Sequence, residues 1–200
     1  MDEKEKNITF NEKNKKGLIN GILQELIISK EIVVIYTDNE NTNTFSVGYI
    51  LAYSENEIVV AYVDEFGNND GFLGKKTYNI IKLEYRSKYS NKIQKLNKIR
   101  GNSINFISVH NESLFLDIMI YAYKFKKIVS IELFNSGIDD AVGYIISIEG
   151  NSAKIKMVNS YGEDDGEMII NIKDITDIAC DTNYQKSLDL LFQHQDQKIV

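Results

Sequence analysis

Apolar residues recur along this chain with two spacings, one typical of helices and one typical of strands. Near the start they fall at i, i+1, i+4, i+5, i+8 and i+9, which is one face of a helix with about 3.6 residues per turn. These residues are Leu18, Ile19, Ile22, Leu23, Leu26 and Ile27. The same spacing returns in Leu114, Phe115, Ile118, Met119, Ala122 and Tyr123. The pattern therefore predicts two amphipathic helices.

Five short segments that predict strands follow each helix. After the first helix they lie near residues 31–36, 46–53, 57–63, just after Gly71, and 80–85. After the second they lie near residues 127–133, 141–148, 153–158, just after Gly166, and 175–180. Polar and apolar residues alternate along 153–158, as expected for a strand with one face in water. A last amphipathic turn closes each set, near residues 89–96 and 184–191.

The two sets are copies of one another. With a shift of 95 residues, 44–96 aligns with 139–191 without a gap, and twelve of the 53 pairs are identical. Two copies of this length favour two domains over a solenoid, whose units run to roughly 20–50 residues. We therefore predict one domain at residues 7–98 and a second at 103–194, joined through about residues 97–104 and packed together through helices and apolar edges.

The most similar stretch of the two copies reads "VDEFGNNDGF" at 63–72 and "VNSYGEDDGE" at 158–167. Asp-Gly between two strand patterns is a strong hairpin signal, because glycine accepts a positive φ without a Cβ clash. We therefore expect hairpin turns at Asp70-Gly71 and Asp165-Gly166. A second bend in each loop is expected at Gly67 and Gly162.

The order of these elements resembles the Sm-like small barrels. It runs helix, strand, "VGYI"-type strand, strand, Asp-Gly hairpin and a last strand, with Gly48 and Gly143 inside strands. The chain is more closely similar to bacterial proteins of unknown role that carry such barrels. The resemblance implies a mainly β, α+β fold of two repeated five-stranded barrels, each preceded by an amphipathic helix. Sm-like proteins that bind RNA use an Arg-Gly loop, and no counterpart precedes Ile80 or Ile175.

Composition narrows the class of protein. The 200 residues carry a formal net charge of −6, with 43% apolar residues and one cysteine. A net negative charge disfavours sequence-independent binding of nucleic acid by the whole surface. No apolar run reaches the roughly 18 residues of a membrane span, and the first residues lack a signal-peptide core. We expect a cytoplasmic protein with no membrane segment and no intrachain disulfide.

No residue pattern points to catalysis. His110 and His194 have no partner at a metal-ligand spacing, and we expect both on the surface. Cys180 follows an alternating strand pattern and is expected to be a small hydrophobic residue, buried or half-buried. The acidic loop at 163–166 lacks the ligand spacing of a calcium loop. We therefore predict no catalytic residues, no metal and no cofactor, and a protein that is not an enzyme.

The repeated loops are the first candidate for binding a partner. The residues that we single out are Phe66, Gly67, Asp70, Tyr161, Gly162 and Asp165. The two aromatic rings either fold back onto the barrel rim, which is the more common arrangement, or stay exposed as anchors. The edges of the barrels offer a further route to oligomers.

A basic stretch is the second candidate. Residues 75–100 hold nine basic side chains and one acidic, whereas the matching part of the second copy is net negative. The candidate patch for nucleic acid comprises Arg86, Lys88, Lys92, Lys95 and Arg100. The other interpretation is a solvated face complementary to the acidic second copy. We predict a binding or scaffolding module for protein partners, and alternatively weak RNA binding through this stretch.

Overall fold

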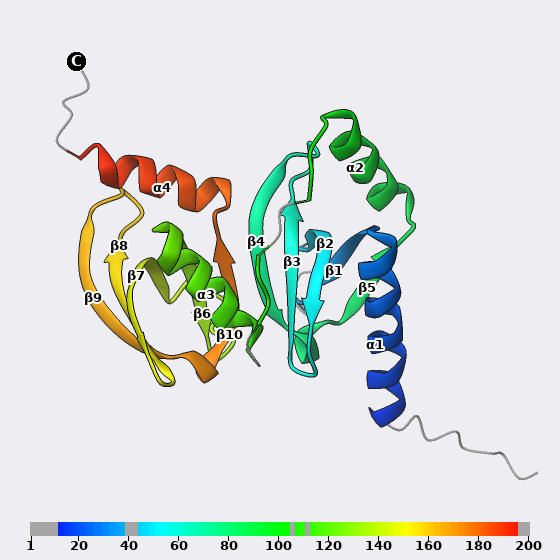
Figure 1. Cartoon of the computed structure of the whole chain (residues 1–200), viewed down its shortest axis with the longest axis horizontal. Coiled ribbons are helices and arrows are strands. Elements are labelled where there is room, and N and C mark those ends of the chain that lie inside the picture. The colour runs from blue at the N-terminus through cyan, green and yellow to red at the C-terminus, as the bar shows by residue number, and fades with distance from the viewer. Residues whose placement is uncertain (1–11, 39–43, 105–106, 111–112, 196–200) are drawn as a thin grey trace, which may run out of the picture.

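The structure, a computed structural model, describes residues 12–38, 44–104, 107–110 and 113–195 (Figure 1). The side chains of residues 12–20, Leu18 and Ile19 among them, lie outside the described part, as does the start of the first predicted domain at 7–11. No helix in the described ranges is long and apolar enough to cross a membrane.

The first half of the chain is a helix, five strands and a closing helix. Its elements are α1 (Glu12–Ser29), β1 (Ile32–Tyr36), β2 (Ser46–Tyr53), β3 (Glu57–Val63), β4 (Asn69–Lys76), the 3-10 turn η1 (Thr77–Asn79), β5 (Lys82–Tyr85) and α2 (Lys88–Ile99).

The second half follows the same order. Its elements are α3 (Leu114–Phe125), β6 (Ile128–Leu133), β7 (Ala141–Glu149), β8 (Ser152–Val158), β9 (Asp164–Asn171), the 3-10 turn η2 (Ile172–Asp174), β10 (Ile175–Cys180) and α4 (Asn183–Gln193). The helices and strands expected from the apolar spacing are present in both halves. The chain is therefore a mixed α+β protein with four helices and ten strands in its described part.

Short polar residues set where the helices begin. The hydroxyl of Ser87 accepts a hydrogen bond from the backbone amide of Ser90 at 3.1 Å, and α2 starts at Lys88, directly after Ser87. Ser113 caps α3 in the same way through the amide of Leu116 at 3.3 Å. Each cap satisfies an amide that has no partner inside the helix.

All ten strands belong to one antiparallel sheet with the order β5-β1-β2-β3-β4-β10-β6-β7-β8-β9. The order within the first half, β5-β1-β2-β3-β4, recurs in the second as β10-β6-β7-β8-β9. Register shifts recur as well, between β3 and β4 at Ala61/Val63 and between β8 and β9 at Lys156/Val158. Such irregularities bend a strand, and β4 and β9 curve strongly in Figure 1.

The expectation of two closed Sm-like barrels is wrong, because the sheet is open. Strand β4 pairs with β10 of the other half, with Lys75 opposite Asp177 and Phe72 opposite Cys180. The hydrogen-bonding edges of these two strands therefore join the halves into one sheet, whose ends are β5 and β9. Apolar spacing predicts that a strand exists but not which strand pairs with its edge, so the pairing of β4 with β10 could not be predicted from the sequence.

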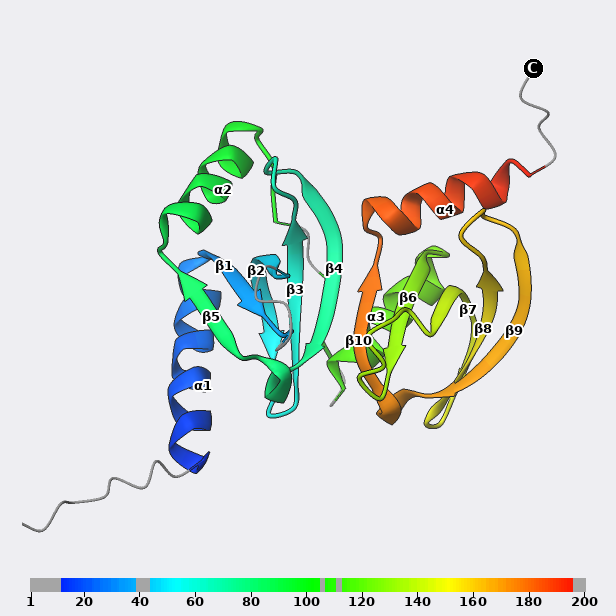
Figure 2. The same ribbon diagram turned by 180° about the vertical axis from the view of Figure 1, so that it is seen from behind.

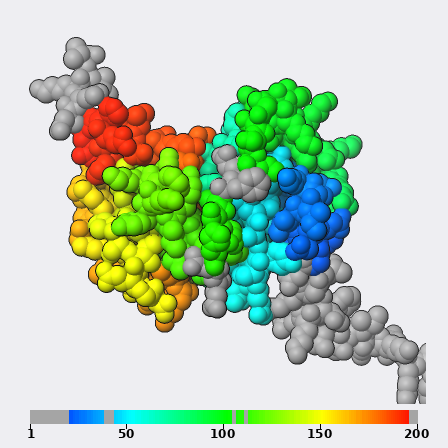
Figure 3. All heavy atoms as spheres, viewed as in Figure 1, coloured from blue at the N-terminus to red at the C-terminus, as the bar shows by residue number. Residues whose placement is uncertain are grey.

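Side chains cross the same junction. Val59 and Phe72 of the first half belong to the apolar cluster that α3 and the second-half strands form. The buried carboxylate of Glu57 accepts hydrogen bonds from the backbone amides of Leu114 (2.7 Å) and Phe115 (3.2 Å) at the start of α3. Figure 3 shows α3 lying over the second half of the molecule, next to the junction. The two halves thus share a core as well as a sheet.

Helices cover both faces of each half of the sheet. In the first half, Val33 and Ile35 pack with the α1 side, whereas Ile32 and Val34 pack with Ile93 of α2. Alternate residues of a strand point to opposite faces, so a strand covered on both sides is apolar throughout. This explains why β1 reads as a continuous apolar run.

Candidate functional site

The two repeated loops are tight turns with the same hydrogen bonds. In the first, Oδ1 of Asp64 accepts from the amides of Phe66 (2.9 Å) and Asn68 (2.8 Å). In the second, Oδ1 of Asn159 accepts from the amides of Tyr161 (2.9 Å) and Glu163 (3.0 Å). A side-chain oxygen that accepts a hydrogen bond from the backbone amide two residues later forms an Asx-turn, which fixes the loop by contacts within it.

The glycine of each turn lies against the closing helix of its half. Gly67 has φ +82° and Gly162 has φ +75°. A Cβ at Gly67 would overlap Leu96 of α2, and a Cβ at Gly162 would overlap Leu191 of α4. Only glycine meets both demands, a positive φ and a close backbone approach.

Side chains of α2 and of the segments that follow α2 and α4 also hold the turns, through the glycine carbonyls. The carbonyl of Gly67 accepts from Nδ2 of Asn97 (3.0 Å) and from Nδ2 of Asn102 (2.9 Å). The carbonyl of Gly162 accepts from Nε2 of Gln195. The first loop is therefore tied to α2 and the segment after it, and the second loop is tied to the segment after α4.

The aromatic ring in front of each glycine points to solvent. Phe66 is 60% exposed and Tyr161 is 76% exposed. The interpretation that these rings fold back onto a rim is wrong, since the positive-φ glycine brings the backbone, rather than the ring, against the helix. Each half thus presents one aromatic side chain on a loop of fixed shape, next to α2 or α4 at the same side of the molecule (Figure 1).

The expectation that Asp-Gly forms the hairpin turn is also wrong. Asp70-Gly71 and Asp165-Gly166 lie inside β4 and β9, beyond the turns. Asp70 is buried, and its Oδ1 accepts from the backbone amide of Asn183 at the start of α4 (2.5 Å). Burial raises the pKa of Asp70, and the hydrogen bond from Asn183 opposes that shift. In the first half the pair therefore makes a contact between halves.

The residues of the basic stretch do not form one free patch. Arg86 makes ion pairs with Glu25 (2.6 Å) and Glu31 (2.9 Å), which raise the pKa of its guanidinium. Nε of Arg100 donates to the carbonyl of Phe66 (2.8 Å) and so braces the aromatic loop.

Further lysines of the stretch divide into two groups. Lys75 pairs with Asp177 across the junction, and Lys76 pairs with the buried Glu57. Lys88, Lys92 and Lys95 are exposed along α2, and no ion pair joins them to any residue that the structure describes.

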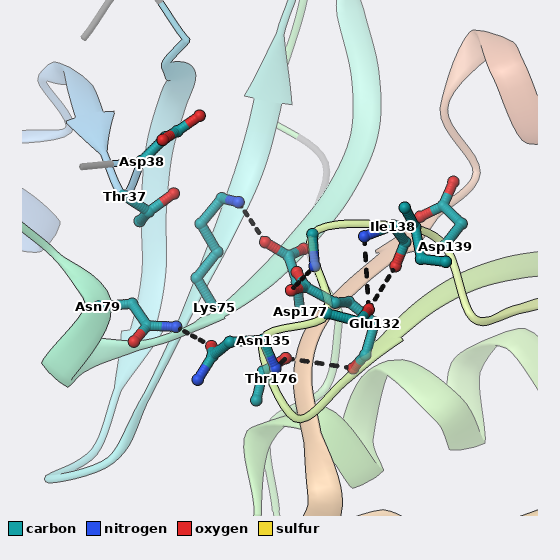
Figure 4. Close-up of a pocket in the computed structure, with 12 residues that line it drawn as sticks. Thr37, Asp38, Lys75, Asn79, Glu132, Asn135, Ile138, Asp139, Thr176 and Asp177 are labelled. Carbon is teal, nitrogen blue, oxygen red and sulfur yellow. Dashed lines mark hydrogen bonds and ion pairs between the residues drawn. The ribbon is translucent and has the colours of Figure 1, made fainter. Parts of the chain in front are cut away.

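A polar cleft of about 940 Å³ opens beside the junction (Figure 4). Its lining residues are Thr37, Asp38, Lys75, Asn79, Glu132, Asn135, Ser136, Gly137, Ile138, Asp139, Thr176 and Asp177. They come from the ends of strands in both halves and from the β6–β7 loop.

Several polar groups of the cleft are bonded to one another. Nδ2 of Asn79 donates to Oδ1 of Asn135 (2.6 Å), and the amide of Asn135 donates to Oγ1 of Thr176 (3.1 Å). Lys75 is held by Asp177. The Asn79–Asn135 and Lys75–Asp177 contacts bridge the two halves, so we assign the cleft a structural role at the junction.

The residues considered for metal or thiol chemistry lie apart. His110 and His194 are exposed, and Cys180 is fully buried as a free thiol, as predicted. Burial raises the pKa of Cys180 and keeps it protonated. Within the described ranges, no three His, Cys, Asp or Glu side chains form a group that could hold a metal ion.

Comparison with protein families, with characterised proteins and with solved structures finds no match to this chain. No relative therefore supports the resemblance to Sm-like proteins that the order of elements implied.

Proposed function

We propose that this chain is a non-enzymatic binding or scaffolding module for protein partners, with Phe66 and Tyr161 as its anchors. The observation that supports it is the exposure of an aromatic ring at the same position of both halves. Exposed aromatic residues are enriched among the side chains that dominate protein interfaces.

The rigidity of the loops supports the same proposal. A partner that binds a fixed loop does not have to order it first, so less free energy is lost on association. Two equivalent anchors on one chain further suit a scaffold, which holds two partner segments at once and gains affinity from the second contact.

The experiment is a pull-down from the native cell with the immobilised chain, after nuclease treatment of the lysate. Affinities of the captured protein are then measured with the parent, with Phe66→Ala/Tyr161→Ala, and with the control Tyr78→Ala/Tyr123→Ala. The control rings are 61% and 53% exposed and lie outside the loops. We expect the loop variant to lose affinity by about tenfold or more, and the control to bind as the parent does. Equal binding by all three chains contradicts the proposal.

A second candidate function is weak binding of single-stranded RNA by α2. Its support is the row of exposed lysines, Lys88, Lys92 and Lys95, at i, i+4 and i+7 of the helix. A groove of about 700 Å³ runs beside them, lined in part by Arg86, Lys95 and Lys98. Phosphate contacts of this kind bind without reading sequence.

Titration with single-stranded RNA at low salt tests the second candidate. Lys88→Glu/Lys92→Glu/Lys95→Glu is compared with the parent and with the control Lys124→Glu/Lys126→Glu/Lys173→Glu, whose lysines are exposed elsewhere. We expect the α2 variant alone to lose binding, and the log affinity of the parent to fall with log salt by about 0.7 per neutralised phosphate. No binding by the parent, or equal loss in both variants, excludes this candidate.

A further inference from the structure

The sheet ends in two strands, β5 and β9, whose outer edges pair with no strand in the part of the chain that the structure describes. They lie at opposite ends of the molecule (Figure 2). The 95-residue shift that aligns the halves places β9 on β4 and β5 on β10. The two free edges are therefore counterparts of the two strands that pair with each other at the centre.

The central junction shows what such a pairing uses. The junction contains more than the hydrogen bonds between β4 and β10. The carboxylate of Asp70 also accepts a hydrogen bond from the backbone amide of Asn183, the first residue of α4. Gly71, with φ +75°, lies so close to the next strand that a Cβ would overlap the carbonyl of Cys180 and the backbone of Asp181. Asp70, which is hydrogen-bonded to the first residue of α4, and Gly71, which leaves room for the end of β10, thus form one contact site. We call this site the docking point.

The same docking point recurs, empty, on β9. Asp165 and Gly166 occupy the positions of Asp70 and Gly71, and Gly166 has φ +85°. Asp165 is exposed, and no atom lies within 4 Å of where a Cβ on Gly166 would be. In the described part of the chain, no backbone lies against Gly166 in the way that the end of β10 lies against Gly71.

The surface that would fit this point is present at the other end of the chain. Arg86 follows β5 with φ +56°, as Asp181 follows β10 with φ +59°. Ser87 then caps α2, as Thr182 caps α4. The backbone at Arg86-Ser87, before α2, therefore has the same conformation as the backbone at Asp181-Thr182, before α4. The latter is the segment that contacts Asp70 and Gly71.

We propose that β9 of one copy pairs with β5 of a second copy, in the register of the β4–β10 junction. That register places Glu167 opposite Tyr85 and Ile170 opposite Lys82. The carboxylate of Asp165 would then accept a hydrogen bond from the backbone amide of Lys88 at the start of α2. The two surfaces differ, so the contact is head-to-tail and leaves a free edge at each end. Repetition closes a ring or extends a filament.

Charge complementarity favours a second copy as the occupant. The β9 side carries Glu163, Asp164, Asp165 and Glu167 within five residues. Asp164 pairs with Lys156 and Glu167 with Lys154 of β8, whereas Asp165 is exposed at the docking point. On the β5 side Lys82 pairs with Glu84, and Arg86 pairs with Glu25 and Glu31. Lys88 and Lys92 are exposed at the start of α2 and provide the positive charge that faces the β9 side. Opposite charges on two docking surfaces guide association and set its register.

The contact is weaker than the central junction. Val59 and Phe72, buried under α3 at the centre, correspond to Lys154 and Glu167, and Gly74 corresponds to the exposed Ile169. A helix of the second copy therefore cannot lie as close, and strand pairing and charge provide most of the attraction. Association of this kind weakens as salt screens the charges.

Sedimentation velocity of the full chain over a concentration series tests the proposal. We expect the parent to shift from single chains to larger species as concentration rises, and to return to single chains when salt is added. Two variants reverse the charges of one edge each, Asp165→Lys/Glu167→Lys and Lys82→Glu/Lys88→Glu. Each alone brings like charges together and stays a single chain.

An equal mixture of the two variants recovers association, because each altered edge then meets an opposite charge on the other chain. The control Glu65→Lys/Glu149→Lys changes net charge as the first variant does, at exposed positions away from both edges, and associates as the parent does. Far-ultraviolet circular dichroism melts check that all chains are folded.

Three results overturn the proposal. The first is a parent that stays a single chain at every concentration, in which case the charges of β9 protect an edge strand from pairing. The second is an equal loss in the control. The third is a mixture that does not recover. We expect Phe66→Ala/Tyr161→Ala to associate as the parent does, because these rings lie outside the two edge strands. The test of self-association is therefore independent of the protein-binding function proposed above.

Discussion

At the scale of the residue, burial sets the chemistry of Cys180. Its thiol is fully buried in the core, where Val59 and Phe72 of the other half also pack. Burial disfavours the charged thiolate and raises the pKa, with a further contribution from the adjacent Asp181. The thiol is a small core side chain that must stay neutral.

The raised pKa of Cys180 predicts a dependence of stability on pH. The folded-state pKa lies above that of the unfolded chain, about 8.5, so the contribution is complete below this pH and is lost as the pH rises. We expect the free energy of unfolding in urea to fall by up to about 1.4 kcal/mol per pH unit above pH 8.5. Cys180→Ala, less stable at pH 7, should lack this slope between about pH 8.5 and 9.5. An identical slope in both chains would contradict the assignment.

At the scale of the element, the same two residues have different surroundings in β4 and β9. Gly71 and Gly166 both adopt a positive φ, but only Gly71 faces another backbone, that of Cys180 and Asp181. The pair provides a built-in comparison, since substitution costs the same conformational strain at both positions and a steric clash at one.

Gly71→Ala should therefore destabilise the protein more than Gly166→Ala. Both variants lose about 1–2 kcal/mol through the left-handed backbone. Gly71→Ala should lose a further amount of about 1–3 kcal/mol, because its Cβ forces β4 and β10 apart. Urea unfolding at low protein concentration, where copies do not associate, measures the difference. Equal losses would show that the junction is looser than described.

At the scale of the whole molecule, the halves are joined by a strand pair, a shared core and a helix cap. The ladder of β4 and β10, the burial of Phe72 beside α3 and the bonds of Glu57 to the start of α3 all cross the junction. Neither half can unfold without exposing apolar surface of the other.

We therefore predict that the chain unfolds in one cooperative transition. Differential scanning calorimetry should give a calorimetric enthalpy equal to the van't Hoff enthalpy. Phe72→Ala should lower the melting temperature while keeping a single transition, since the side chain is buried between the halves. Two separate transitions in the parent would contradict this prediction and would show that the domains predicted at residues 7–98 and 103–194 unfold separately.

The positions of the helices and strands can be predicted from the amino-acid sequence alone. Helices followed from residues such as Leu23 and Leu26, which are buried at the expected spacing, and strands from apolar runs such as 32–35. The burial of Cys180 was equally predictable. These features depend on neighbours a few residues apart, which the spacing of apolar side chains records directly.

How these strands pair with one another is seen only in the folded protein. Backbone amides and carbonyls form the β4–β10 ladder, and they are the same in every residue type, so no residue pattern revealed that the sheet is continuous. For the same reason Asp70-Gly71 and Asp165-Gly166, alike in sequence, could not be assigned to a junction and a free edge. That difference depends on which strand lies opposite, and the partner of Gly71 is more than a hundred residues away along the chain.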